Sequence, residues 1–125
     1  MDNIKSFDYK TYKNCYFIVS SYTCDPMAMA ISIFNNSDGD ITTVTVYMDG
    51  YVYAPGLTAI KNYSENTGIT KFLQELGIIE EILDRRPPNQ HVAHTLNTPN
   101  PETIDWCVIN TDKLKEYTKE WYYNV

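Results

Sequence analysis

Several features that characterise large protein classes are missing from this sequence. No apolar run reaches the length of about 18 residues that spans a membrane. The three cysteines (Cys15, Cys24 and Cys107) are an odd set without a CxxC spacing, so we expect no disulfide framework. The P-loop, the Rossmann glycine fingerprint, the Gly-x-Ser-x-Gly elbow and the HExxH motif are also absent. We therefore expect no membrane span, no cofactor and no enzymatic activity.

Basic residues are missing from a long central stretch. No Lys or Arg occurs between Lys13 and Lys61, and the only charges there are Asp25, Asp38, Asp40 and Asp49. The whole chain has a formal net charge of -6. A negative surface repels phosphate, so we expect no direct binding of nucleic acid, but it suits a basic protein partner. The first residues lack the apolar run of a signal peptide, so a cytoplasmic location is expected.

Alternating residues predict a protein rich in β-strands. At 125 residues and 43% hydrophobic content, the chain is expected to form a single domain over residues 1–125. Period-two patterns predict strands over residues 14–22, 27–34, 41–48, 51–54 and 104–109. Asp38-Gly39 and Asp49-Gly50 predict hairpin turns between consecutive strands.

Helical periodicity occurs in two segments. Ile69, Phe72, Leu73 and Leu76 share one face of a helix over residues 67–76, with Asn66 or Thr67 as the expected N-cap. Leu114, Tyr117 and Trp121 predict a second helix over residues 111–122. Residues 1–13 fit a short helix or an irregular arm, and residues 78–83 fit a helix or a strand. The sequence thus predicts an α+β fold, in which an antiparallel sheet of four to five strands carries both helices on one face.

Tyrosines and carboxylates gather at one point of the predicted sheet. Tyr47, Tyr51 and Tyr53 surround Asp49, and the chain contains eleven tyrosines. Tyrosine is enriched in protein interfaces because it offers rigid contact area with one polar tip. With Asp38 and Asp40, these four residues are our predicted partner-binding surface. Glu80, Glu81 and Asp84 form a second predicted acidic patch. The alternative is that these tyrosines belong to the core and to an ordinary sheet surface.

Residues for metal or catalytic chemistry are few and scattered. His91 and His94 have a spacing that binds zinc on a helix, but on the extended chain expected between prolines they point to opposite faces. We therefore expect no metal site. An enzyme built on this chain would have to assemble its site from dispersed residues such as Cys24, His91, His94 and Glu102.

Four segments carry a resemblance to a known family. They are residues 28–33 (AMAISI), 40–46 (DITTVTV), 59–66 (AIKNYSEN) with Phe72-Leu73, and 107–110 (CVIN). In this pattern the chain resembles small uncharacterised α+β proteins carried by phages and conjugative elements of Gram-positive bacteria. The resemblance covers about residues 14–117, except that segment 80–103 is longer and proline-rich here.

The resemblance implies a setting in which small acidic proteins often counter host defences, as anti-CRISPR proteins do. We therefore expect a non-enzymatic inhibitor that binds a host protein at a basic nucleic-acid-binding surface. The alternatives are an immunity protein that neutralises a toxin, a small enzyme without a recognisable motif, and an accessory protein that forms a homodimer through an exposed strand edge.

Overall fold

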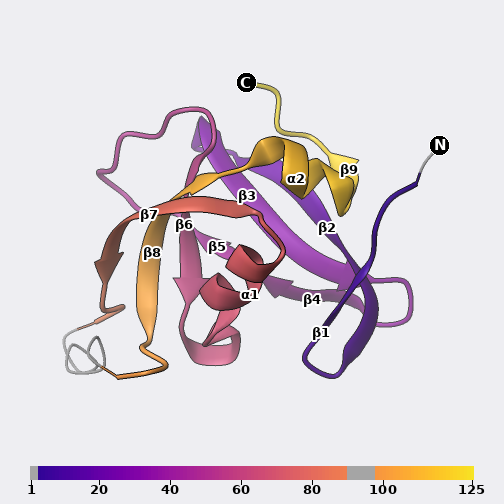
Figure 1. Ribbon diagram of the computed structural model, residues 1–125. Coiled ribbons are helices and arrows are strands. Elements are labelled where there is room, and N and C mark those ends of the chain that lie inside the picture. Colours follow the sequence, from indigo (N-terminus) through magenta and orange to yellow (C-terminus); the bar gives the residue numbers. More distant parts are fainter. Residues whose placement is uncertain (1–2, 90–97) are drawn as a thin grey trace.

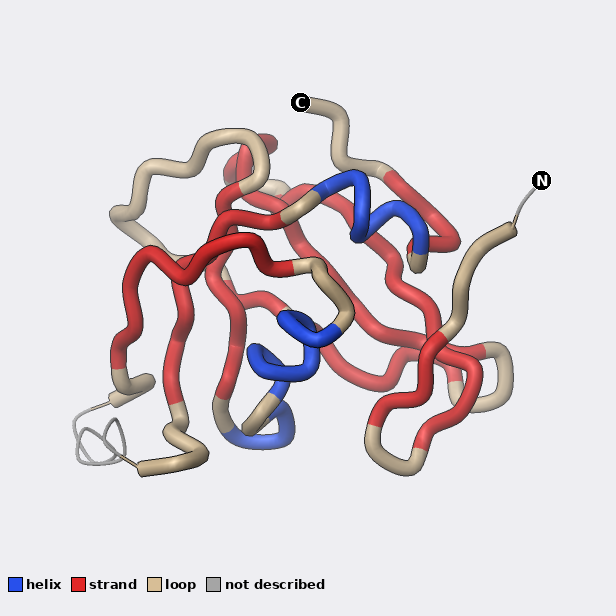
Figure 2. The backbone as a smooth tube through the Cα atoms, in the orientation of Figure 1, coloured by secondary structure: helices blue, strands red, loops and turns tan. Residues whose placement is uncertain are grey.

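The computed structural model describes residues 3–89 and 98–125 and consists mostly of antiparallel strands with short helices (Figures 1 and 2). The expected α+β class is confirmed. The strands form two sheets, however, where a single sheet was expected.

The first sheet has five strands. Its order is β1 (Phe7–Tyr9), β2 (Tyr12–Tyr22), β3 (Asp25–Asn35) and β4 (Gly39–Thr43), and β9 (Thr118–Trp121) pairs in parallel with β2. The segment expected as a helix or an arm at residues 1–13 therefore contains β1 and the start of β2. The β3–β4 hairpin forms at Asp38-Gly39 as predicted, with Asn35 opposite Gly39.

The second sheet has four strands, in the order β5 (Thr45–Val46), β6 (Leu57–Asn62), β8 (Thr103–Ile109) and β7 (Ile79–Arg86). The strand expected at residues 104–109 is confirmed as β8, and residues 79–83 of the ambiguous segment belong to β7. Residues 51–54 form no strand. The chain turns at Asp49-Gly50 and then continues as a loop that leads to β6.

The backbone of Val44 hydrogen-bonds to both sheets. The N–H of Val44 donates to the carbonyl of Ile31 in β3 at 2.8 Å, and its own carbonyl accepts from the N–H of Lys61 at 2.8 Å. Val44 is fully buried. The single strand expected over residues 41–48 is therefore split into β4 and β5, because its two halves pair with different sheets.

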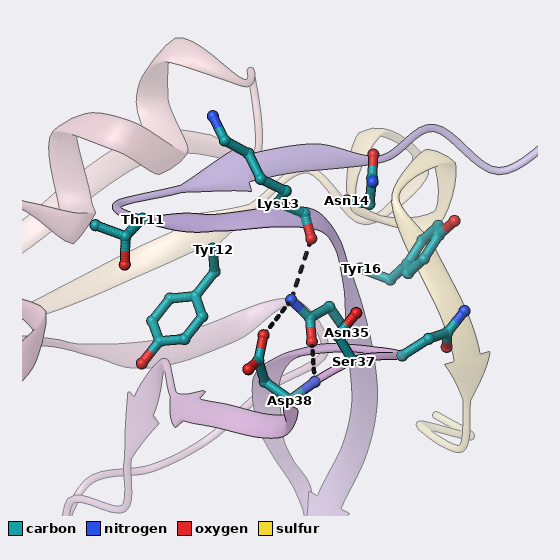
Figure 3. A pocket seen from close by; sticks show the side chains of 9 residues that line it. Thr11, Tyr12, Lys13, Asn14, Tyr16, Asn35, Ser37 and Asp38 are labelled. Atoms are coloured by element: carbon teal, nitrogen blue, oxygen red, sulfur yellow. Dashed lines mark hydrogen bonds between the residues drawn. The ribbon is translucent and has the colours of Figure 1, made fainter.

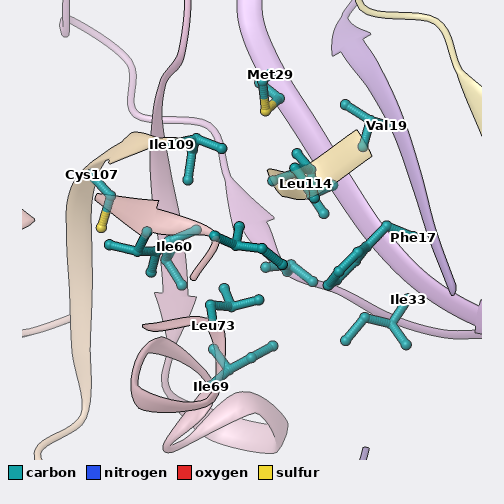
Figure 4. Packing of buried hydrophobic residues seen from close by; sticks show 14 of the residues in the cluster. Phe17, Val19, Met29, Ile33, Ile60, Ile69, Leu73, Cys107, Ile109 and Leu114 are labelled. Atoms are coloured by element: carbon teal, nitrogen blue, oxygen red, sulfur yellow. The ribbon is translucent and has the colours of Figure 1, made fainter. Parts of the chain in front are cut away.

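The alternating faces of the central strands supply the core (Figure 4). Phe17 and Val19 of β2 are fully buried, as are Ile31 and Ile33 of β3, which confirms the predicted strand faces. On β8 every second residue from Thr103 to Ile109 is buried.

The helices are shorter than expected. They are η1 (Ser64–Asn66), α1 (Ile69–Glu75) and α2 (Thr111–Glu116). The chain expected to continue α2 to residue 122 instead forms β9, because β2 has an unpaired edge beside it: Phe17 N–H donates to the carbonyl of Tyr117 at 2.9 Å. Helix α1 contacts β6 and β7, whereas α2 contacts β9.

The start of α1 is capped from a distance. Neither Asn66 nor Thr67 caps it, and Gly68, with φ of 92°, stands at the N-cap. The Asn62 Oδ1 atom accepts from the N–H groups of Gly68 at 3.1 Å and Thr70 at 3.0 Å. Asn66 is buried and instead binds β4, where its Nδ2 donates to the carbonyl of Thr43 at 2.7 Å.

A buried carboxylate links α1 to the edge strand β7. Asp105 on β8 lies opposite Arg85 on β7, and its side chain is 0% exposed. Its two oxygens accept from Arg85 Nε at 2.8 Å and Nη2 at 3.0 Å. The hydroxyl of Thr70 in α1 donates to the same carboxylate at 2.6 Å.

Replacing Arg85 by leucine should lower the free energy of unfolding by about 2–4 kcal/mol, because a buried charge would lose its partner. The double variant Arg85→Leu/Asp105→Leu should recover part of that loss. Urea denaturation of the three proteins measures both effects. Equal losses in the single and double variants would contradict this role of the ion pair.

Candidate functional site

Five aromatic side chains form one continuous array at the end of β2. Tyr22 contacts Tyr47 at 5.4 Å between ring centroids, and Tyr47 stacks on Tyr53 at 5.2 Å with an interplanar angle of 9°. Trp106 then meets Tyr53 edge-on at 4.9 Å and Tyr51 at 5.0 Å. We call these five residues the tyrosine cluster.

The cluster is assembled from both sheets and the loop between them. Tyr22 ends β2, and Trp106 stands on the face of β8 opposite to that of buried Asp105. Residues 47–56, between β5 and β6, bring the other three rings over Trp106. Two hydroxyls hold the arrangement: Met48 N–H donates to the hydroxyl of Tyr53 at 2.8 Å, and the hydroxyls of Tyr22 and Thr45 lie 2.9 Å apart.

The rings differ in accessibility. Tyr53 is only 7% exposed, so its role is to support the cluster. Tyr47, Tyr51 and Trp106 are half-buried and keep ring surface open to solvent. Val52, between two of the cluster's tyrosines, is 88% exposed. The accessible part of the cluster is therefore the open ring surface of Tyr47, Tyr51 and Trp106.

Carboxylates surround the exposed rings. Burial raises the pKa of Tyr47, and the neighbouring Cys24, Asp25 and Asp49 raise it further. On the other side, Asp84 of β7 lies opposite Trp106. The cluster is thus bordered by Asp25, Asp49 and Asp84.

One cation lies within this border. The guanidinium of Arg86 lies 5.2 Å from the ring centroid of Tyr51, and its Nε pairs with Asp84 at 2.9 Å. Hydrogen bonding to Asp84 raises the pKa of Arg86. The carboxylate of Asp84 is therefore partly neutralised, whereas Asp25 and Asp49 form no ion pair with another of the described residues.

The predicted acidic residues fall into three places. Asp49 is exposed, and its charge acts on Tyr47, so it lies at the border of the tyrosine cluster. Asp38 and Asp40 lie on the β3–β4 hairpin, at the opposite end of β3 from Asp25. At about 3.3 Å per residue, the ends of this strand are roughly 30 Å apart.

The second predicted patch lies on the edge strand β7. Glu80, Glu81 and Asp84 are all exposed there. Asp84 borders the tyrosine cluster because it lies opposite Trp106 on β8. Glu81 lies opposite Val108, further along the same strand.

Sequence reasoning missed Tyr22, Asp25, Trp106 and Arg86 as members of this surface. Each belongs to a segment distant in sequence from residues 47–53, so local spacing carried no signal for it. The one available indication was the alternation of residues 104–109, which places Trp106 on the opposite face from Asp105 and Cys107.

The residues considered for an enzyme do not meet in the described part of the chain. Cys24 lies beside Tyr47, whereas Glu102 accepts from Ser64 N–H at 3.2 Å. His91 and His94 lie outside the described residues. Within residues 3–89 and 98–125, no three His, Cys, Asp or Glu side chains are grouped to hold a metal ion.

No family model matches the chain, and neither a curated protein nor a solved structure matches it. In the described ranges, each helix is too short or too polar to cross a bilayer.

The hydroxyl of Tyr53 should stabilise the loop that carries the cluster. Replacing Tyr53 by phenylalanine keeps the stacked ring but removes the bond to Met48, and should lower the free energy of unfolding by about 1 kcal/mol. Urea denaturation measures the loss. The matched control is Tyr122→Phe, whose ring is 58% exposed and whose hydroxyl bond to Glu120 is at the surface. An equal effect in both variants would contradict the assignment.

Proposed function

We propose that the protein is a non-enzymatic binder whose tyrosine cluster and bordering carboxylates occupy a basic site on a partner protein. The observation that carries this proposal is the continuity of the surface. The half-buried rings of Tyr47, Tyr51 and Trp106 belong to one array; the charges of Asp25 and Asp49 act on Tyr47, and Asp84 lies opposite Trp106.

The aromatic rings and the carboxylates would contribute to binding in different ways. Rings that are already packed against each other lose little conformational entropy on association, so they suit the buried centre of an interface. The carboxylates would attract a basic partner and fix its orientation. Such a partner is a protein whose basic surface normally binds nucleic acid, with Asp49 and its neighbours standing where phosphates would lie.

This surface fits the activity expected of an anti-CRISPR-like inhibitor of a host defence protein. The net charge of -6 supports attraction to a basic target and repulsion from nucleic acid itself. We place the contact on the outer face of the second sheet and its covering loop rather than on the β3–β4 hairpin, because the hairpin residues Asp38 and Asp40 are not bordered by the cluster's rings.

Charge reversal should distinguish the two regions. The partner is first captured from a host lysate with the tagged protein at low salt, and its affinity is then measured with purified variants. Asp49→Lys/Asp84→Lys should weaken binding about tenfold or more and flatten its dependence on salt, because long-range attraction is lost.

The matched control is Asp40→Lys/Glu75→Lys, which makes the same change in charge at exposed positions away from the cluster. Equal losses in both double variants would show that only net charge matters. Full affinity in the cluster variant would contradict the proposed surface.

Cys24 offers an independent test. It is exposed, whereas Cys15 and Cys107 are fully buried, and burial raises the pKa of Cys107 to about 12. We expect a bulky maleimide to label Cys24 alone in the folded protein, and the label beside Tyr47 to block partner binding. The Cys24→Ser variant should bind normally before and after treatment. A labelled wild-type protein that binds with full affinity would contradict the proposal.

A further inference from the structure

A polar pocket lies at the opposite end of β3 from the tyrosine cluster (Figure 3). Its volume is about 470 Å³, within the range of small-molecule sites. The start of β2 forms one wall and the β3–β4 turn forms the other. Asn35 and Asp38 lie between the side chains of Tyr12 and Tyr16 in the view of Figure 3.

The two walls are held together by one buried amide. Asn35 is only 4% exposed, and its Nδ2 donates to the carbonyl of Lys13 at 3.1 Å and to Asp38 Oδ2 at 3.0 Å. Its Oδ1 accepts from the N–H of Asp38 at 2.6 Å. The position of the Asp38 carboxylate is therefore fixed by the fold and does not depend on a ligand.

A β-bulge shapes the other wall. Lys13 and Asn14 of β2 together lie opposite the single residue Asp8 of β1, and Asn14 has a φ of 54°. The bulge is stabilised by Asn14 N–H, which donates to Asp8 Oδ1 at 3.1 Å. Bulges bend a strand and redirect its side chains, and here Asn14 joins the lining.

The charges near the pocket are nearly balanced. Lys13 pairs with Asp8 at 3.3 Å, so its ammonium group is directed to the neighbouring strand. Lys119 lies at the rim, where its Nζ donates to Asn36 Oδ1 at 3.3 Å, so a further cation stands near the pocket beside a further anion, Asp38. A strongly anionic or cationic ligand would find no excess of opposite charge.

The lining also argues against an apolar ligand. Among the described residues, no Val, Leu, Ile, Met or Phe lines the pocket. The lining instead offers amides from Asn14 and Asn36, hydroxyls from Ser37 and the tyrosines, and one carboxylate from Asp38. These groups both donate and accept hydrogen bonds, and the tyrosine rings add flat apolar faces.

We propose that this pocket binds a neutral carbohydrate. A pyranose ring carries hydroxyls that donate to Asp38 and accept from the amides of Asn14 and Asn36, and its C–H face can lie against a tyrosine ring. The site is distinct from the tyrosine cluster and does not depend on the function proposed above, because the length of β3 separates the two.

Amide chemical shifts of the full chain test this proposal. The probes are methyl α-D-glucopyranoside, methyl β-D-galactopyranoside, N-acetyl-D-glucosamine and cellobiose. We expect at least one of them to shift the signals of residues 11–16 and 35–38 in a saturable manner, and to leave those of residues 47–53 unchanged. Asn36→Ala and Asp38→Asn should each weaken that binding about fivefold, the effect of losing one hydrogen bond.

Asp40→Asn is the matched control, since Asp40 follows the same turn but does not line the pocket. It should bind like the wild type. Without sugar, the spectrum of each variant should match that of the wild type except near the substitution. This control separates loss of binding from loss of fold. The proposal is overturned if no probe shifts these signals, if the shifts persist in both pocket variants, or if inorganic phosphate or calcium ions bind there more tightly than every sugar.

Discussion

The buried carboxylate of Asp105 is the constraint on which the second sheet depends. Strand β7 lies at the edge of this sheet beside β8, and its residues beyond Ile82 are largely exposed. Arg85 anchors this strand to the buried carboxylate of Asp105, and the hydroxyl of Thr70 in α1 donates to the same carboxylate. Burying a carboxylate is costly unless hydrogen-bond donors and a positive charge surround it. The polar contact therefore specifies how helix and strand meet.

The contacts of Asp105 also determine which side chains lie on the outer face of β8. Asp105 and Trp106 are consecutive on β8, so fixing one side chain inward directs the other outward. The transfer of the chain from the first sheet to the second at Val44 then leads residues 47–56 across that outer face. The tyrosine cluster arises where these two features coincide, and the charge-balanced polar pocket lies at the far end of β2 and β3 in the first sheet.

Much of the strand pattern was predictable, because alternation reflects which face of a strand is buried. This holds for β2, β3 and β8, whose buried residues match the predicted faces. The errors arose where a distant partner decides the structure. Val44 hydrogen-bonds to Ile31 in the first sheet and to Lys61 in the second. Residues 118–121 continue the helical spacing of Leu114, Tyr117 and Trp121, but they pair with β2. Asn62, rather than an adjacent residue, caps α1. For the same reason the tyrosines around Asp49 were found from sequence, but Tyr22 and Trp106 were not.

The parallel pairing of β9 with β2 has a consequence for how the protein folds. Phe17 and Thr118 are cross-strand partners although residues 18–117 lie between them. Contacts of such long sequence separation require closure of a large loop, which slows folding. During synthesis the β2–β3–β4 meander emerges well before β9, so the part of β2 that pairs with β9 lacks its partner until β9 has followed. The edge of β2 from Phe17 to Val19 is thus open to intermolecular pairing until β9 covers it.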